Sequence, residues 1–179
     1  MLRAALLTLV LLAAPAAAEN RTGFVAGPVL PDVGPIAPVD SDLPLPKGAK
    51  FKIAFDISAK ATPGALSRQI ETAARTLNMH VAAGVPQKDM QIVAIFHGAG
   101  AVDLLKPDVY AVRNDGKANG SMDAIAKLIG AGVEFYLCGQ TAMGQNISKA
   151  DLLPGVKMSL SAITAHAVYQ QRGYTLNPF

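Results

Sequence analysis

The chain has 179 residues, a net charge of +3 and 51% hydrophobic residues, which is the size and composition of about one globular domain. So small an excess of positive charge excludes the basic stripe of a nucleic-acid-binding protein, and no nucleic-acid partner is expected. The single cysteine, Cys138, excludes an internal disulfide and a cysteine-rich metal cluster.

Residues 1–18 have the layout of a secretory signal peptide. Arg3 supplies the positive start, and an apolar run extends from Ala4 to Ala14. Small residues at 16–18 have the pattern of a cleavage site, so cleavage is expected before Glu19. The apolar run is too short for a helix that crosses a bilayer core of about 30 Å. The sequence therefore predicts an exported, periplasmic protein whose mature form has no membrane span.

Residues 19–48 carry six of the twelve prolines of the chain. Proline fixes φ and removes a backbone donor, so this density excludes regular helix and central strand. A proline-rich leader or linker is expected here. Three arrangements remain open, namely an arm that reaches a neighbouring subunit, an extended strap along the domain, and a flexible leader.

The folded domain is expected to occupy residues 49–179 and to begin with a strand, a helix and a second strand. Residues 50–57 alternate apolar with polar or small residues, which predicts a strand. Thr62 and Pro63 have the character of a helix N-cap and a first helical residue, and apolar residues at helical spacing continue from there to Gly84. Residues 90–96 form a short continuous apolar run, typical of a strand buried on both faces.

The second half of the domain continues this alternation. A short extended piece is expected at 109–112, and a helix begins at Asn119 or Ser121 and ends at Gly130. The remaining elements are two strands and a final helix, at 133–137, 156–160 and 162–171. Alternating strands and helices predict an α/β fold with three α/β/α layers and a mostly parallel sheet.

Ligands of such sheets bind beyond the carboxyl ends of the strands, and two chemically active side chains are expected there. His97 follows the strand at 90–96, and Cys138 follows the strand at 133–137. A thiol at the start of a helix is favoured as thiolate by unpaired N–H groups and the helix dipole. Cys138 is therefore a candidate nucleophile or sulfur carrier. The competing interpretation is a small, buried and inert side chain.

The residues near the thiol supply the other candidates. Gly139 lets the backbone approach whatever the sulfur carries. Gln140, Thr141 and Asn146 are candidate hydrogen-bond donors to a persulfide or a sulfur oxyanion, although a role as cap of the following turn is equally open for Thr141. His97 is a candidate proton acceptor for the thiol, or else a ring that hydrogen-bonds the turn after it.

The other polar motifs indicate structural roles. His80 and His166 fall in helices and are expected to be surface or helix-packing residues. Three dispersed histidines and one cysteine have no metal-ligand spacing, so neither a metal nor another cofactor is expected. Ser148 and Asp151 have the spacing of a capping box.

Several stretches form an ordered set of motifs. They are GVEFYLCG at 132–139 with Gln140-Thr141 after it, DLLPGV at 151–156, QRGY at 171–174, and His97-Gly98 at the end of a strand. On these motifs the chain resembles the exported branch of the DsrE/DsrF-like (DsrE/TusD) family over residues 51–179. The resemblance implies a three-layer domain of the flavodoxin-like topology class that assembles into homo-oligomers, trimers or hexamers. In the relay members of that family a cysteine at a strand end carries a persulfide, and Cys138 matches it.

Three functions follow as hypotheses. In the first, a periplasmic DsrE-like protein holds or relays sulfane sulfur as a persulfide on Cys138, as a sulfurtransferase or as a carrier. Its partner is a sulfur-donor or acceptor thiol, in a protein or a small molecule. In the second, the chain is a non-catalytic binding or oligomeric assembly module in which Cys138 is buried and inert. In the third, the same crevice senses a small ligand without covalent chemistry.

Overall fold

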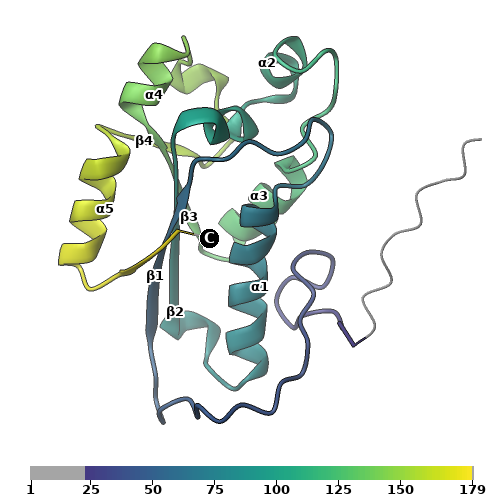
Figure 1. Cartoon of the computed structure of the whole chain (residues 1–179), viewed down its shortest axis with the longest axis vertical. Coiled ribbons are helices and arrows are strands. Elements are labelled where there is room, and N and C mark those ends of the chain that lie inside the picture. Colours follow the sequence, from purple (N-terminus) through teal and green to yellow (C-terminus); the bar gives the residue numbers. More distant parts are fainter. Residues whose placement is uncertain (1–22, 179) are drawn as a thin grey trace, which may run out of the picture.

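The computed structural model describes residues 23–178 and shows a sheet between two layers of helices (Figure 1). The predicted signal peptide, residues 1–18, lies outside the described residues. The strands are β1 (Phe51–Ile57), β2 (Met90–Phe96), β3 (Glu134–Cys138), β4 (Lys157–Ser159) and β5 (Thr175–Asn177). All neighbouring strands run parallel, in the order β4-β3-β2-β1-β5.

The α-helices of the described chain are α1 (Arg68–Ala82), α2 (Pro107–Val112), α3 (Met122–Gly130), α4 (Gly139–Gly144) and α5 (Ala162–Gln171). Short 3-10 helices are η1 (Gln87–Asp89), η2 (Gly98–Leu104) and η3 (Lys149–Asp151). α1 and α3 cover one face of the sheet, and α4 and α5 lie on the opposite side (Figure 1). α5 brings the chain from β4, at one edge, back across the sheet to β5 beside β1. This confirms the predicted α/β fold with its three layers.

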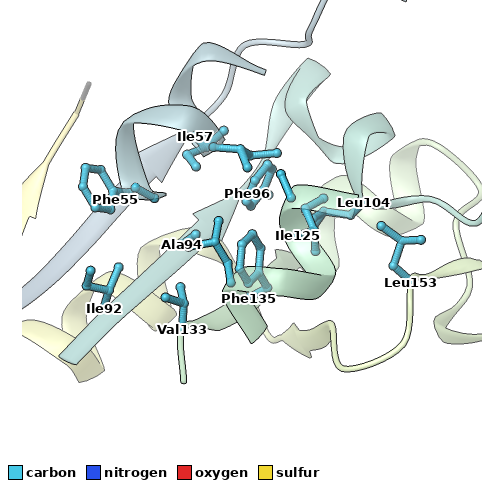
Figure 2. Packing of buried hydrophobic residues seen from close by; sticks show 14 of the residues in the cluster. Phe55, Ile57, Ile92, Ala94, Phe96, Leu104, Ile125, Val133, Phe135 and Leu153 are labelled. Carbon is cyan, nitrogen blue, oxygen red and sulfur yellow. The ribbon is translucent and has the colours of Figure 1, made fainter. Parts of the chain in front are cut away.

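The main hydrophobic core lies between the sheet and the layer of α1 and α3. Phe55 and Ile57 of β1 and Phe96 of β2 belong to it, because every second residue of a strand faces the same side (Figure 2). Phe96 stacks on Phe135 of β3, with ring centroids 5.9 Å apart. This packing of large side chains from adjacent strands specifies their register, and so aligns the residues at their carboxyl ends.

A second, smaller core lies between the sheet and α5. Its members are the alternate residues of the central strands and the inward face of α5, namely Ala54, Val93, Ile95, Cys138, Ala162, Ala165 and Tyr169. β2 is therefore buried on both faces, as its continuous apolar run predicts. Cys138 belongs to the α5 side of the sheet.

Residues 23–48 contain no helix or strand, and the part at 29–35 forms a strap that is hydrogen-bonded to α1. Leu30 and Val33 of the strap are buried. The side chain of Asn78, which is fully buried in α1, accepts the N–H of Leu30 (2.9 Å) and donates to the carbonyls of Leu30 (3.0 Å) and Val33 (2.9 Å). These hydrogen bonds satisfy backbone groups of a segment that has no ladder of its own.

Two elements differ from the sequence prediction. α1 begins at Arg68 and not at Thr62, because Gly64 has a φ of +86° and the N–H of Ala65 donates to the Thr62 carbonyl (2.9 Å), which makes a turn. Residues 109–112 are not extended but belong to α2, since Pro107 presets the first helical residue. β5 and η2 are additional elements that the sequence analysis does not predict.

Other local predictions are confirmed. β2 and α5 have the predicted bounds. The capping box is present, with the N–H and the hydroxyl of Ser148 each 2.7 Å from Oδ2 of Asp151. Among the helices of residues 23–178, none has both the length and the apolar character needed to cross a membrane.

Candidate functional site

Cys138 ends β3 and is the N-cap residue of α4. Only 6% of the residue is exposed. Gly139 follows it, and a Cβ on that residue would stand 2.6 Å from the carbonyl oxygen of Ser159 in β4. Glycine is therefore required for the turn after the thiol to lie this close to β4.

The surroundings of the Cys138 sulfur have two opposing effects on its pKa. Burial raises the pKa, because a thiolate loses hydration. Hydrogen bonds from the N–H and hydroxyl of Thr141, and from the N–H groups of Ala162 and Gln140, outweigh burial and leave the pKa below its usual value. Because N–H groups from the starts of both α4 and α5 point to one atom, the thiolate of Cys138 is stabilised relative to that of an ordinary cysteine.

Thr141 also connects the thiol to the loop that follows β2. The N–H of Gly98 donates to Oγ1 of Thr141 (3.1 Å), and the side-chain amide of Gln145 donates to the Gly98 carbonyl (2.7 Å). A hydroxyl accepts and donates at the same time. The Thr141 hydroxyl can therefore accept the N–H of Gly98 and donate to the sulfur of Cys138 at the same time.

His97 lies at the end of β2 and bonds to a carboxylate. Its Nε2 is 3.0 Å from Oδ1 of Asp56 in β1. The Nε2 of His166, in α5, is 2.7 Å from the same oxygen. Of the two positions predicted for His166, on the surface or in helix packing, the structure shows the second, since the side chain is 13% exposed and joins α5 to the sheet at this site. His80, by contrast, bonds within α1, with Nδ1 2.8 Å from the carbonyl of Thr76.

Asp56 is the site residue that the sequence analysis does not identify. The available signal is a carboxylate between the apolar residues Phe55 and Ile57, near the carboxyl end of a predicted strand. A carboxylate at such a half-buried position needs a partner. Its two partners, however, lie 41 and 110 residues away, so no local spacing could identify them.

The remaining predicted donors have different places. The side chain of Gln140 donates to the Leu160 carbonyl (3.3 Å), and it is the backbone N–H of Gln140 that bonds the thiol. Asn146 follows the end of α4 with a φ of +51° and lines a hollow of about 340 Å³ together with Gly139 and Met143. Cys138 does not line this hollow. The structure therefore brings Gly139, Gln140 and Thr141 to the thiol, whereas Asn146 is not among the residues that bond the sulfur.

Exposed apolar side chains flank the buried thiol. Met143 in α4 is 80% exposed, Leu160 before α5 is 73% exposed, and Ile163 in the first turn of α5 is 83% exposed. They belong to the two segments whose N–H groups bond the Cys138 sulfur. Contiguous groups of exposed apolar residues are a feature of surfaces that meet other molecules.

Across residues 23–178, no group of three or more His, Cys, Asp or Glu side chains is arranged to hold a metal ion. The chemistry that the described side chains offer is that of one thiol, two imidazoles, one carboxylate and one hydroxyl. These groups come from β1, the loop after β2, β3, α4 and α5, at the carboxyl end of the sheet.

Comparison with known proteins identifies the family. The profile of the DsrE/DsrF-like family matches residues 50–178. Two solved structures share the fold. The protein of unknown function MTH1491 from Methanobacterium thermoautotrophicum has 18% sequence identity and a TM-score of 0.55 over 73% of this chain and 100% of that chain. The ychN protein from E. coli has 15% identity and a TM-score of 0.50 over 72% of this chain and 99% of that chain.

No curated protein matches the sequence. The family profile nevertheless covers more than half of the chain, including all five strands and the cysteine that ends β3. The chain belongs to the DsrE/DsrF-like family.

Proposed function

We propose that the protein is an exported sulfur carrier that holds sulfane sulfur as a persulfide on Cys138 and passes it to an acceptor thiol. One observation carries this proposal, namely that the sulfur of a nearly buried cysteine is surrounded by N–H and hydroxyl donors that lower its pKa. A cysteine buried in apolar surroundings has a raised pKa, whereas a carrier needs the thiolate, which is the reactive form. The donors around Cys138 act in the direction that a carrier requires.

The transfer needs no oxidant or reductant. The Cys138 thiolate attacks the outer sulfur of a donor persulfide, R–S–SH, while the S–S bond of the donor breaks and the donor leaves as a thiolate. The product on the protein is Cys138–S–SH, and the proton that Cys138 lost goes to the departing donor thiolate. Delivery repeats the step with an acceptor thiolate as the attacking group. A low pKa of Cys138 also favours delivery, because Cys138 is then the leaving group.

The proposed partner is a thiol, carried by a protein or by a small molecule. The exposed side chains of Met143, Leu160 and Ile163 beside the thiol support a protein partner, because such a group of apolar residues gains free energy when it is covered. The signal-peptide pattern of residues 1–18 supports a periplasmic location. We further propose assembly into homo-oligomers, trimers or hexamers, on the strength of the family membership.

The test is the intact mass of the protein purified without reductant, before and after exposure to inorganic polysulfide. The matched control is Cys138→Ser. The proposal expects wild type alone to gain the mass of one sulfur atom, and expects a reductant to remove that gain.

The low exposure of Cys138 favours a second candidate, a binding or assembly module with an inert thiol. The same experiment separates the two functions. If folded wild type gains no sulfur, and its thiol reacts only after denaturation, the carrier function is wrong and the binding module takes its place.

A further inference from the structure

We propose that Asp56 and His166 are positioning residues that hold the His97 ring as the proton acceptor for Cys138. The inference rests on the proposed carrier function and adds to it the path of the thiol proton. It gives a role to two residues that lie far from Cys138 in the sequence and that meet on the same face of the sheet.

His97 and Cys138 stand side by side on adjacent strands. Ile95 packs with Cys138 in the core under α5, and His97 comes two residues after Ile95, so its side chain leaves the strand on that same face. The register pairs Phe96 with Leu137, which places His97 and Cys138 in the next row. Since neighbouring strands lie about 4.8 Å apart, residues 97 and 138 are lateral neighbours in the sheet, and from there the His97 ring extends to Asp56 while the thiol is bonded from α4 and α5.

Asp56 reaches this face from β1. It pairs in register with Ile95, two residues before His97, and it follows Ala54, which packs under α5. A carboxylate, an imidazole and a thiol therefore follow one another across β1, β2 and β3. The hydrogen bonds to the sulfur in this structure come from α4 and α5, and contacts to a catalytic base are often long until substrate is bound.

The Asp56 carboxylate determines which nitrogen of each ring carries the hydrogen. An ionised carboxylate only accepts hydrogen bonds, so the Nε2 of His97 and that of His166 are both N–H donors. The Nδ1 of a neutral His97 then has a free lone pair, on a side chain that is 33% exposed. This is the arrangement in which a carboxylate orients a histidine base beside a nucleophile.

His166 holds the carboxylate from the other side. Its Nδ1 is buried and has no hydrogen-bond partner within the described residues, so the bond from Nε2 to Asp56 is what orients the ring. Ala162 lies four residues earlier on the same face of α5, and its N–H bonds the Cys138 sulfur. One face of α5 thus carries both Ala162, whose N–H bonds the sulfur, and His166, which bonds the Asp56 carboxylate.

The other ionisable groups on the α5 side lie toward the amino ends of the strands. Lys52 of β1 donates to the carbonyl of Arg172 (3.0 Å), and Glu134 is the centre of a separate network. Glu134, at the amino end of β3, accepts hydrogen bonds from Lys157 (2.8 Å), Tyr169 (3.0 Å) and Tyr136 (3.3 Å). This network pairs its charges internally. The groups that remain to act on the thiol proton are those around Asp56.

The proton path is balanced with the transfer of sulfur. Nδ1 of His97 takes the proton of the Cys138 thiol as the sulfur attacks the outer sulfur of the donor persulfide. The Asp56 carboxylate stabilises the imidazolium that forms. His97 then returns the proton to the departing donor thiolate, so that the imidazole is neutral again when Cys138–S–SH is complete.

The test is the rate at which iodoacetamide alkylates Cys138 in the folded protein, measured against pH. The variants are Asp56→Asn, His97→Gln, His166→Leu and His166→Gln, with His80→Gln as the control in α1. We expect the pH midpoint of alkylation to rise by about one unit in Asp56→Asn, which is about a tenfold loss of rate at neutral pH, because the charge that stabilises the imidazolium is removed. His166→Leu should act in the same direction, and His166→Gln should recover part of the effect because its amide can donate to Asp56.

Wild-type midpoints in both Asp56→Asn and His166→Leu would overturn the positioning role. If Asp56→Asn does not fold, as judged by near-UV circular dichroism, His97→Gln decides, because a wild-type midpoint there removes the proton acceptor from the mechanism. Sulfur loading of the same proteins separates this inference from the carrier function. If the variants load sulfur and keep the wild-type pH midpoint of alkylation, the carrier function stands and the positioning role is wrong. If their midpoints shift but wild type loads no sulfur, the carrier function alone is wrong.

Discussion

Asp103 offers a quantitative test of how burial acts on a charge in this fold. It lies in η2, shortly after His97, and is fully buried. Its Oδ2 accepts the N–H of Ala61 (2.9 Å), whereas Oδ1 has no hydrogen-bond partner among residues 23–178. Burial raises the pKa of Asp103 from 3.8 to about 6, against the opposing effects of the Ala61 N–H and the charge of Lys60.

The magnitude follows from this difference in pKa. Because the folded state binds the Asp103 proton more tightly than the unfolded state does, the protonated carboxyl is the form that suits the fold. Its contribution to stability is complete below pH 3.8 and is lost as the pH rises to about 6. Above that pH the native state is less stable by at most about 3 kcal/mol than it would be with a neutral side chain of the same shape.

Asp103→Asn supplies that neutral side chain, since its amide oxygen can still accept the Ala61 N–H. Urea unfolding at several pH values between 4 and 8 measures the free energy of unfolding of both proteins. The variant should be more stable than wild type at pH 7 by up to about 3 kcal/mol, and the difference should shrink toward zero near pH 4. A difference that does not change with pH would refute the reasoning, because it would show that the substitution acts through packing and not through the charge.

Three further predictions concern the strap and the thiol turn. Asn78→Ala should lower the free energy of unfolding by about 2–4 kcal/mol, because it leaves buried backbone groups of the strap without partners; unfolding at the wild-type urea concentration would contradict this. Gly139→Ala should lower it by about 1–3 kcal/mol through the collision with β4 in the same assay, while Gly144→Ala, where a Cβ meets open space, should not. Thr141→Val should raise the pKa of Cys138 by removing a hydroxyl donor, so that alkylation moves to higher pH, and Thr141→Ser should keep the wild-type profile.

Much of the architecture could be predicted from local pattern. The run at 90–96 is β2, because a strand buried on both faces has a continuous apolar sequence, and residues 162–171 are α5, with Gly173 just beyond its end. Local pattern does not predict an element whose position depends on one backbone dihedral angle or on pairing with a strand far away in the sequence. Gly64 turns the chain before α1 can begin, and β5 is a three-residue strand that exists through its pairing with β1.

The candidate site likewise has some residues that local pattern predicts and others that it does not. That Cys138 and His97 each stand at the end of an apolar strand could be predicted from the sequence, since strand ends follow from the apolar runs. The folded chain adds two facts that no local pattern contains. β2 and β3 are neighbours in the sheet, and α5 crosses the sheet and sets His166 against the carboxylate of Asp56, 110 residues away. The lowered pKa of Cys138 also depends on tertiary structure. It depends on the N–H groups of two helices meeting at one sulfur atom, and that convergence arises only when β3, α4 and α5 pack together.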